Sequence, residues 1–404
     1  MDPIARHYVV LSLALGEHIE GFVDAYYGPA ELKQQAIASG AALVSLAEQA
    51  SALRERVANE EPDEQRRRWL DRQLVAIETL ARRANGEETT YLDEVERCFD
   101  ARPERTPAGE YANMRNDLER LLPGTGSLAE RLKQRDQRLT IPRERVESVI
   151  TWVVDQARAA ASEIWPVPAG ESLAIELVTD QPWSAYNWYD GDLRSRIEVN
   201  TDLPTRAMAL PYLATHETFP GHHLEHAWKE QRLVREHGRL EASVQLINTP
   251  EAYISEGLAE VGGNLLFDPA VWQDLLIGIC ERSGIRMDAE DAEREWQTIE
   301  AMRALKRSSG DAALQLHVEG RSQEEVVQFL IDEALRTREQ AEKSMEFLTH
   351  PLWRTYVFCY AGGEELLTTW CRAAGDAQAQ RDRFFRLLTE QITPSGVAEE
   401  LAAT

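Results

Sequence analysis

Apolar residues recur at three- and four-residue steps along most of the chain, which is the pattern of helices that bury one face. The clearest runs cover residues 43–57, 70–80 and 146–157, and the last of these follows Pro142, a residue that favours a helix start. Ser322 and Glu325 form a capping-box pattern ahead of a further apolar run. The sequence therefore predicts a mainly α fold built from many helices.

The pattern changes between about residues 165 and 205. Apolar residues occupy every second position over 173–177 and 197–199, and this period of two indicates short strands. We expect one small antiparallel β-sheet here, with a helix beginning near residue 205 and running into a His/Glu motif. The strand near residues 196–200 either aligns an extended substrate by strand addition or belongs to a purely structural sheet.

These patterns divide the chain into two regions. Residues 1–164 form an N-terminal helical region, and residues 165–404 form the region that carries the candidate chemistry. The second region comprises the small sheet (165–205), metal-site helices (206–270) and C-terminal helices (271–404). We expect the two regions to form one integrated unit.

The chain is strongly acidic, with 69 Asp and Glu residues, 44 Lys and Arg residues and a net charge of −25. Because phosphates and anionic lipids require a basic surface, no nucleic-acid or membrane partner is expected. The apolar opening at residues 8–15 is too short to span a bilayer and lacks a signal-peptide cleavage site. The scattered cysteines contain no C-x-x-C pair, which favours a cytoplasmic location; they are Cys98, Cys280, Cys359 and Cys371.

The segment His216-Glu217-Thr218-Phe219-Pro220-Gly221-His222-His223 is the most informative part of the chain. It is similar to the zinc-hydrolase motif H-E-x-x-H, in which two histidines on one helix face bind a metal and the glutamate activates a metal-bound water. Here Pro220 stands where the second histidine of that motif would fall. The segment is therefore either a modified metal site or a coincidence of a His-rich sequence.

Pro220 prevents a regular helix through this segment, because it has no N–H for the carbonyl of His216 and its ring crowds that carbonyl. Gly221 gives the backbone freedom to bulge or kink. If the Pro-Gly pair is looped out, His222 takes the place of the second ligand. If the helix stays nearly straight, His223 lies closer to the direction of His216, about 20° away. We favour His222, and His223 is the alternative.

A third ligand is expected downstream, because catalytic zinc sites hold three protein ligands and one open position. Glu256 and Glu260 lie four residues apart in Tyr253-Ile254-Ser255-Glu256-Gly257-Leu258-Ala259-Glu260, so they share one helix face. One of them can bind the metal while the other accepts a hydrogen bond from a ligand histidine. The alternative is a pair of exposed carboxylates.

The pattern H-E-x-x-P-G-H-H followed by E-G-L-A-E resembles the hallmark of the DUF885 family of bacterial proteins, H-E-x-x-P-G-H-x-x-Q with a later E-G-W-A. That family is mostly helical and similar in fold to M32-type carboxypeptidases and their gluzincin relatives. The resemblance implies this architecture, and a zinc-dependent, peptidase-like hydrolase, from about residue 165 to the end. It implies one Zn²⁺ on His216, His222 and Glu256, with Glu217 as general base.

Two positions depart from the family pattern, since Glu225 and Leu258 stand where the family has Gln and Trp. The resemblance also implies catalytic roles for two C-terminal residues. His317 follows a leucine ahead of a helix, as in the family, and Tyr360 lies in a Y-x-x-G stretch from which a hydroxyl would donate to an oxyanion. The alternatives are a structural histidine and a packed aromatic residue.

Together these features predict a cytoplasmic zinc metallopeptidase, carboxypeptidase-like, that acts on a peptide or small amide. Two alternatives remain open. The chain is a metal-binding or degenerate member of the family without turnover, or it is a helical scaffold or partner-binding protein whose histidine cluster is incidental.

Overall fold

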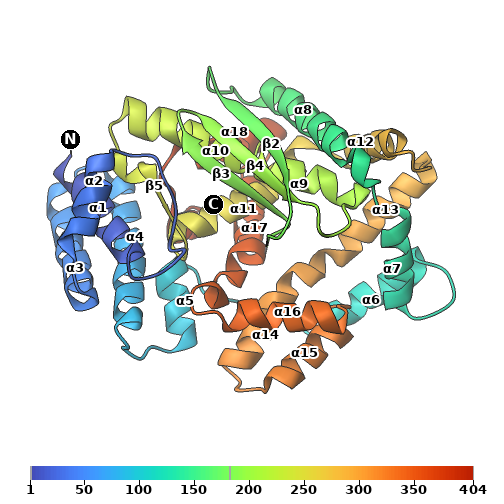
Figure 1. The fold of residues 1–404 in the computed structure, drawn as a ribbon, viewed down its shortest axis with the longest axis horizontal. Coiled ribbons are helices and arrows are strands. Elements are labelled where there is room, and N and C mark those ends of the chain that lie inside the picture. Colours follow the sequence, from blue (N-terminus) through green and yellow to red (C-terminus); the bar gives the residue numbers. More distant parts are fainter. Residues whose placement is uncertain (1, 182, 404) are drawn as a thin grey trace.

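The computed structural model describes residues 2–181 and 183–403 of the chain and is mainly helical, as the periodicity predicts (Figure 1). The N-terminal helices are α1 (Pro3–Gly16), α2 (Ala30–Ser39), α3 (Leu43–Glu60), α4 (Glu64–Ala84), α5 (Tyr91–Phe99), α6 (Glu110–Leu121), α7 (Leu128–Arg138) and α8 (Val146–Ile164). The helices that follow are α9 (Leu210–Glu217), α10 (His222–Lys229), α11 (Pro250–Leu266), α12 (Pro269–Ser283), α13 (Ala289–Ala301), α14 (Ser308–His317), α15 (Gln323–Asp332), α16 (Arg338–Thr349), α17 (Val357–Arg372), α18 (Ala377–Thr389) and α19 (Pro394–Ala402).

The expected helix signals fall where the structure has helices. The run at 43–57 lies within α3, and the one at 146–157 lies within α8, which begins after a short 3₁₀ turn that follows Pro142. Ser322 and Glu325 form the predicted capping box at the start of α15. The helix expected near residue 205 begins as a 3₁₀ turn, η2 (Ala207–Ala209), and continues as α9.

The predicted sheet is present, but the prediction that it is antiparallel is wrong. Strands β2 (Ser172–Val178), β3 (Ala185–Gly191) and β4 (Arg194–Asn200) pair in the order β2-β4-β3. β3 is antiparallel to β4, whereas β2 runs parallel to it, because β2 lies beyond β4 and not beside its chain neighbour β3. The central strand β4 therefore has no free edge, which excludes strand addition along residues 196–200.

A second, two-stranded sheet lies outside the predicted region. Strand β1 (Val23–Tyr26) pairs antiparallel with β5 (Val244–Leu246), so the N-terminal region joins the segment between α10 and α11. In Figure 1 the three-stranded sheet lies beside α9 and α10, while α14, α15 and α16 lie on the opposite side of the view.

The two larger hydrophobic cores cross the predicted division at residue 164. One core joins α1–α5 to β5 and to buried residues of α14–α17. The other joins α8 and β4 to α9–α13 and to α17–α19. Helices α11 and α17 contribute to both cores, so this helix pair ties the two halves of the molecule together. Among the described residues no helix is both long enough and apolar enough to cross a membrane.

Glycines allow α11 and α17 to approach at backbone distance. A Cβ atom built on Gly257 would lie 2.6 Å from the backbone carbon of Gly363, and one built on Gly363 would lie 2.7 Å from the carbonyl oxygen of Tyr253. Any side chain at these positions would force the helices apart. The contact fixes the position of α11 along the axis of α17. It therefore also fixes the position of Glu256, the neighbour of Gly257.

We predict that Gly257→Ala lowers the free energy of unfolding by about 1–3 kcal/mol, because its methyl group overpacks the helix contact. Chemical denaturation measures the change. Thr369→Ala is the matched control: this exposed residue of α17 bonds only its own helix, so a change within about 0.5 kcal/mol is expected. Equal stability of Gly257→Ala and wild type would contradict the proposed role of the contact.

Candidate metal centre

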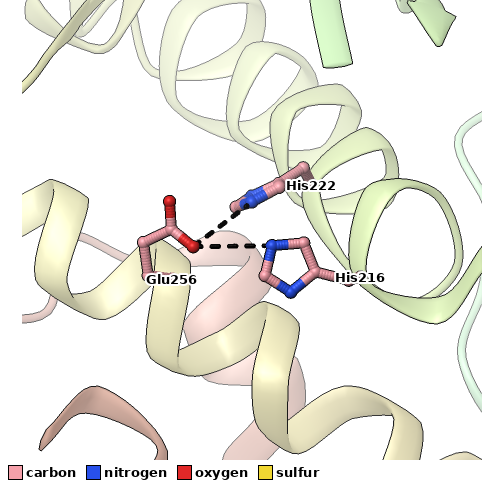
Figure 2. Close-up of side chains that lie close together, drawn as sticks. All are labelled: His216, His222 and Glu256. Carbon is pink, nitrogen blue, oxygen red and sulfur yellow. Dashed lines mark ion pairs between the residues drawn. The ribbon is translucent and has the colours of Figure 1, made fainter. Parts of the chain in front are cut away.

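Three predicted ligands meet where α9, α10 and α11 converge. One donor atom from each of His216, His222 and Glu256 lies within 4.8 Å of the other two (Figure 2). Glu256 Oε2 lies 3.4 Å from His216 Nε2 and 3.9 Å from His222 Nε2, and the two imidazole rings are nearly perpendicular. Two donors bound tetrahedrally at 2.0–2.2 Å lie about 3.4 Å apart, so these separations suit a shared ion.

The Pro-Gly pair separates two helices and does not bulge one. α9 ends at Glu217 and α10 begins at His222, and the connecting turn is held by a hydrogen bond of 2.9 Å from the Gly221 N–H to the Thr215 carbonyl. A Cβ atom on Gly221 would lie 1.9 Å from the His216 carbonyl oxygen, so only glycine fits. The looped-out geometry expected from Pro220 brings His222 to the site.

The alternative ligand, His223, lies elsewhere. Its ring is fully buried and bonded at both nitrogens, with Nδ1 2.8 Å from Ser195 Oγ and Nε2 2.8 Å from Glu171 Oε2. Because His222 begins the helix, its neighbour points about 100° away, toward β4. His223 therefore ties α10 to the sheet and has no free nitrogen for a metal.

The orientation of His222 is set by a pair of hydrogen bonds. The Ser255 hydroxyl donates to Glu225 Oε2 at 2.6 Å, so its oxygen accepts from His222 Nδ1 at 3.2 Å. A proton on Nδ1 leaves the Nε2 lone pair directed toward Glu256. Glu225 is itself buried and is bonded by Lys229 Nζ at 2.6 Å. Glu225, which stands where the DUF885 pattern has Gln, thus supports the candidate ligand His222.

A second set of charged groups lies behind His216. Glu260 Oε1 is 3.9 Å from His216 Nδ1, in the position predicted for an orienting carboxylate. The Tyr212 hydroxyl and the Lys306 ammonium group both donate to Glu260. His216 Nδ1 is buried and has no hydrogen-bond partner among the described residues, so Glu260 is a candidate acceptor for it.

Glu256 has one oxygen in use and one without a partner. The Tyr356 hydroxyl donates to Oε1 at 2.7 Å, whereas the buried Oε2 has no hydrogen-bond partner in the part of the chain that the structure describes. Leaving a buried carboxylate oxygen unbonded costs free energy, and a cation would remove that cost. Two imidazole nitrogens and a carboxylate oxygen are the ligand set of many catalytic zinc sites, so these residues fit zinc.

The surrounding carboxylates control the protonation of both histidines. Burial lowers the pKa of His222, but the hydrogen-bonded Glu225 and the charges of Glu256 and Glu217 outweigh it and raise the pKa to about 9. Burial lowers the pKa of His216, but the Glu256 and Glu217 carboxylates together outweigh burial and the His222 charge, so the pKa is raised. Burial raises the pKa of Glu256, yet the two histidines hold that pKa below its ordinary value. The cluster thus favours positive charge.

A neighbouring group of possible ligands already has partners. His222, Glu225 and His226 also offer donor atoms within 4.8 Å. However, Glu225 is bonded by Lys229 and Ser255, and His226 Nδ1 is 2.9 Å from Gln245 Nε2. An ion there would have to displace an ammonium group that is already buried, so this group forms the support for His222.

The cluster borders a cavity of about 190 Å³ that other predicted residues also line. Glu217 is half-buried at its edge, and Tyr360 of α17 lies beside Tyr356, with ring centroids 5.8 Å apart. Asp24 of β1 lines the same cavity and accepts a hydrogen bond from Tyr186 of β3. Burial raises the pKa of Asp24, and the nearby Glu256 and Glu217 charges add to that rise.

The predicted catalytic residue His317 does not line this cavity. Its Nε2 lies 2.8 Å from the Leu348 carbonyl, and its ring stacks on Tyr91 with centroids 4.4 Å apart. The resemblance in sequence at the end of α14 therefore marks a packed, structural histidine. Tyr356, four residues before Tyr360, holds the candidate ligand carboxylate of Glu256 through its hydroxyl, and no sequence motif marks this role.

No known family model matches the sequence, and no curated protein is similar to it. Solved structures with a similar fold include a "putative lipoprotein from Colwellia psychrerythraea", with a TM-score of 0.53 at 13% identity; the match covers 89% of this chain and 67% of that chain. They also include a "putative lipoprotein of unknown function from Shewanella oneidensis", with a TM-score of 0.50 at 13% identity; this match covers 92% of this chain and 76% of that chain. At this identity the likeness shows a shared fold alone.

We predict that replacing the two adjacent histidines separates metal binding from stability. Loss of a residue that supports a ligand typically weakens metal binding by about 10–100-fold, and His222→Ala should weaken zinc binding by more than that. His223→Ala should retain zinc but lower the free energy of unfolding by about 1–3 kcal/mol, because Glu171 and Ser195 lose their buried partner. Zinc titration and thermal melting test both variants. Loss of zinc in His223→Ala alone would contradict the assignment.

Proposed function

We propose that this chain is a zinc-dependent hydrolase of peptide or small amide bonds. The observation that carries the proposal is the convergence of His216, His222 and Glu256 donor atoms within 4.8 Å beside a cavity that Glu217 also lines. The resemblance to the DUF885 pattern agrees with this function. The wider likeness to M32-type carboxypeptidases is the reason for favouring peptides as substrates.

His216, His222 and Glu256 would hold the zinc ion, and the free Oε2 of Glu256 and the Nε2 atoms of the two histidines are the atoms in reach. A bound zinc ion supplies a Lewis acid for the scissile carbonyl and lowers the pKa of a water molecule. Glu225 would hold the His222 ring through the Ser255 hydroxyl, and Glu260, 3.9 Å from His216 Nδ1, would be the acceptor that orients the other ring.

Glu217 is the proposed general base. It directly follows His216, and its carboxylate is half-buried at the cavity edge without an ion pair among the described residues. Asn187 Nδ2 donates to its backbone carbonyl at 2.7 Å, which fixes the end of α9 against β3. In the reaction the carboxylate takes the proton of the attacking water and passes it to the leaving amine.

Two tyrosines take different roles in this proposal. Tyr356 holds Glu256 through its hydroxyl, whereas Tyr360 has no hydrogen-bond partner among the described residues and lines the cavity. Burial and the nearby Glu256 charge raise the pKa of Tyr360, so its hydroxyl stays protonated at neutral pH. A protonated Tyr360 donates a hydrogen bond to the oxyanion that develops on the substrate carbonyl.

An extended substrate would lie along β3. Among the described strands it pairs only with β4, so its other edge has no strand partner, and Tyr186 and Asn187 from it line the cavity. Backbone groups on an open edge can pair with a substrate backbone.

Replacing the base should separate catalysis from metal binding. Glu217→Gln is expected to keep one zinc per chain and to lower kcat by about 10²–10⁴-fold, the contribution of a positioned proton acceptor. Metal content and hydrolysis of a diverse peptide set measure the two effects. Glu281→Gln, an exposed residue of α12, is the control and should match wild type.

The outcomes distinguish the competing functions. Zinc binding by wild type without hydrolysis of any peptide would favour a metal-binding protein without turnover. Absence of zinc binding would favour a helical scaffold, although the distances within the His216–His222–Glu256 cluster argue against that function.

Substitutions of the two tyrosines should likewise separate metal binding from catalysis. Tyr356→Phe is expected to weaken zinc binding by about 10–100-fold, because Glu256 loses the hydroxyl that holds it. Tyr360→Phe should leave zinc binding unchanged and lower kcat by about 10²-fold or more, as expected when an oxyanion donor is removed. If Tyr360→Phe also keeps wild-type kcat, Tyr360 is a packing residue only.

A further inference from the structure

A second, larger cavity lies on the other side of α9 from the metal centre. It has a volume of about 790 Å³, within the range of organic-ligand pockets, and it is bounded by α7, α9, α13 and α16 and by η5 (Met302–Arg307). Tyr212, Thr215 and Glu260 line it, while His216 and Glu256 from the same two helices face the metal centre. Helices α9 and α11 thus form the wall between the two cavities.

The charge of this cavity is opposite to that of the chain. Its lining holds six basic side chains and three carboxylates, although the chain as a whole has a net charge of −25. The cavity at the metal centre has the reverse balance, with five carboxylates and one lysine. A positively lined cavity in an acidic protein concentrates anions.

Four of the six basic groups are already neutralised. Arg206 pairs with Asp136, Arg303 with Glu300 and Lys306 with Glu260, which accounts for all three carboxylates of the lining. Arg135 pairs with Glu295, which lies outside the lining. The remaining two, Arg336 and Lys343, have no ion pair among the described residues.

Arg336 carries the main unbalanced charge. It is half-buried, and its hydrogen bonds go to neutral hydroxyl groups, those of Ser309 at 2.9 Å, Ser308 at 3.4 Å and Ser344. These bonds use Nη1 and Nη2, so the serines orient the guanidinium while Nε–H has no partner among the described residues. Burial without a carboxylate lowers the pKa of Arg336. Such a group gains free energy when an anion arrives.

The same cavity also offers an apolar surface. Trp272 of α12 and Trp296 of α13 lie with ring centroids 5.1 Å apart, and Phe267 and Phe347 also contribute to the lining. A ligand that suits the whole cavity therefore has an aromatic or other apolar part as well as a negative group.

We propose that this cavity is a binding site for an organic anion, a carboxylate or phosphate with an apolar group, and that Arg336 is its anchor and Lys343 its second cation. The site is separate from the zinc ligands and does not depend on the proposed hydrolase activity. Because a carboxylate and a phosphate present similar oxygen atoms to a guanidinium, the two ligand classes share one chemistry.

Calorimetric titration of the full chain with 3-phenylpropionate and with phenyl phosphate tests the proposal, with the neutral amide 3-phenylpropionamide as control ligand. EDTA is included so that neither anion binds through a metal. We expect one saturable site for at least one anion and no binding of the amide. Binding of 3-phenylpropionate alone assigns a carboxylate, and binding of phenyl phosphate alone assigns a phosphate.

Variants locate that site. Arg336→Gln should weaken anion binding by about tenfold or more, the loss expected for a charge-assisted hydrogen bond. Lys343→Gln, at an exposed position, should weaken it less and serves if Arg336→Gln does not fold. Arg338→Gln is the matched control. Arg338 lies on α16, the helix that carries Lys343, but it pairs with Glu324 and is about half exposed. The proposal is overturned if neither anion binds, if the amide binds equally well, or if both cavity variants bind as wild type does.

Discussion

The close contact between α11 and α17 is the constraint on which the site depends. Gly257 and Gly363 let the two backbones touch, and the same two helices contribute to both hydrophobic cores. Glu256 comes directly before Gly257, and Tyr360 lies one turn before Gly363. The candidate ligand and the candidate oxyanion donor are therefore held by a closely packed helix pair. Such rigidity suits a site whose ligands must stay within tenths of an ångström.

The second constraint is electrostatic. Burying a carboxylate costs several kcal/mol unless a partner compensates it. Each buried acid around the cluster has such a partner: Lys229 for Glu225, Lys306 for Glu260, and the two histidines for Glu256. Both histidine Nε2 atoms lie within 3.9 Å of Glu256 Oε2, yet this oxygen accepts no hydrogen bond from the described residues. The α9–α11 wall also divides a cation-favouring cavity from an anion-favouring one, so two kinds of ligand can bind without competing for the same charge.

Local sequence signals predicted much of this arrangement. Helical periodicity gave the mainly α fold, and the missing N–H of Pro220 correctly indicated a break that moves His222 to the site. The parallel pairing of β2 with β4 could not be predicted, because alternation reports strands and not their partners. Asp24 lies almost two hundred residues before His216 and reaches the cavity only through the β1–β5 pairing. Glu225 lies three residues after His222, but in the sequence it was only a departure from the DUF885 pattern, and its bond to Ser255 beside His222 was not predicted.

We propose that His216, His222 and Glu256 bind one metal ion, and anomalous scattering at the zinc absorption edge from crystals grown with zinc tests this. We expect a single strong peak about 2.0–2.2 Å from His216 Nε2, His222 Nε2 and Glu256 Oε2. A peak at another group of residues, or no peak at saturating zinc, would contradict it.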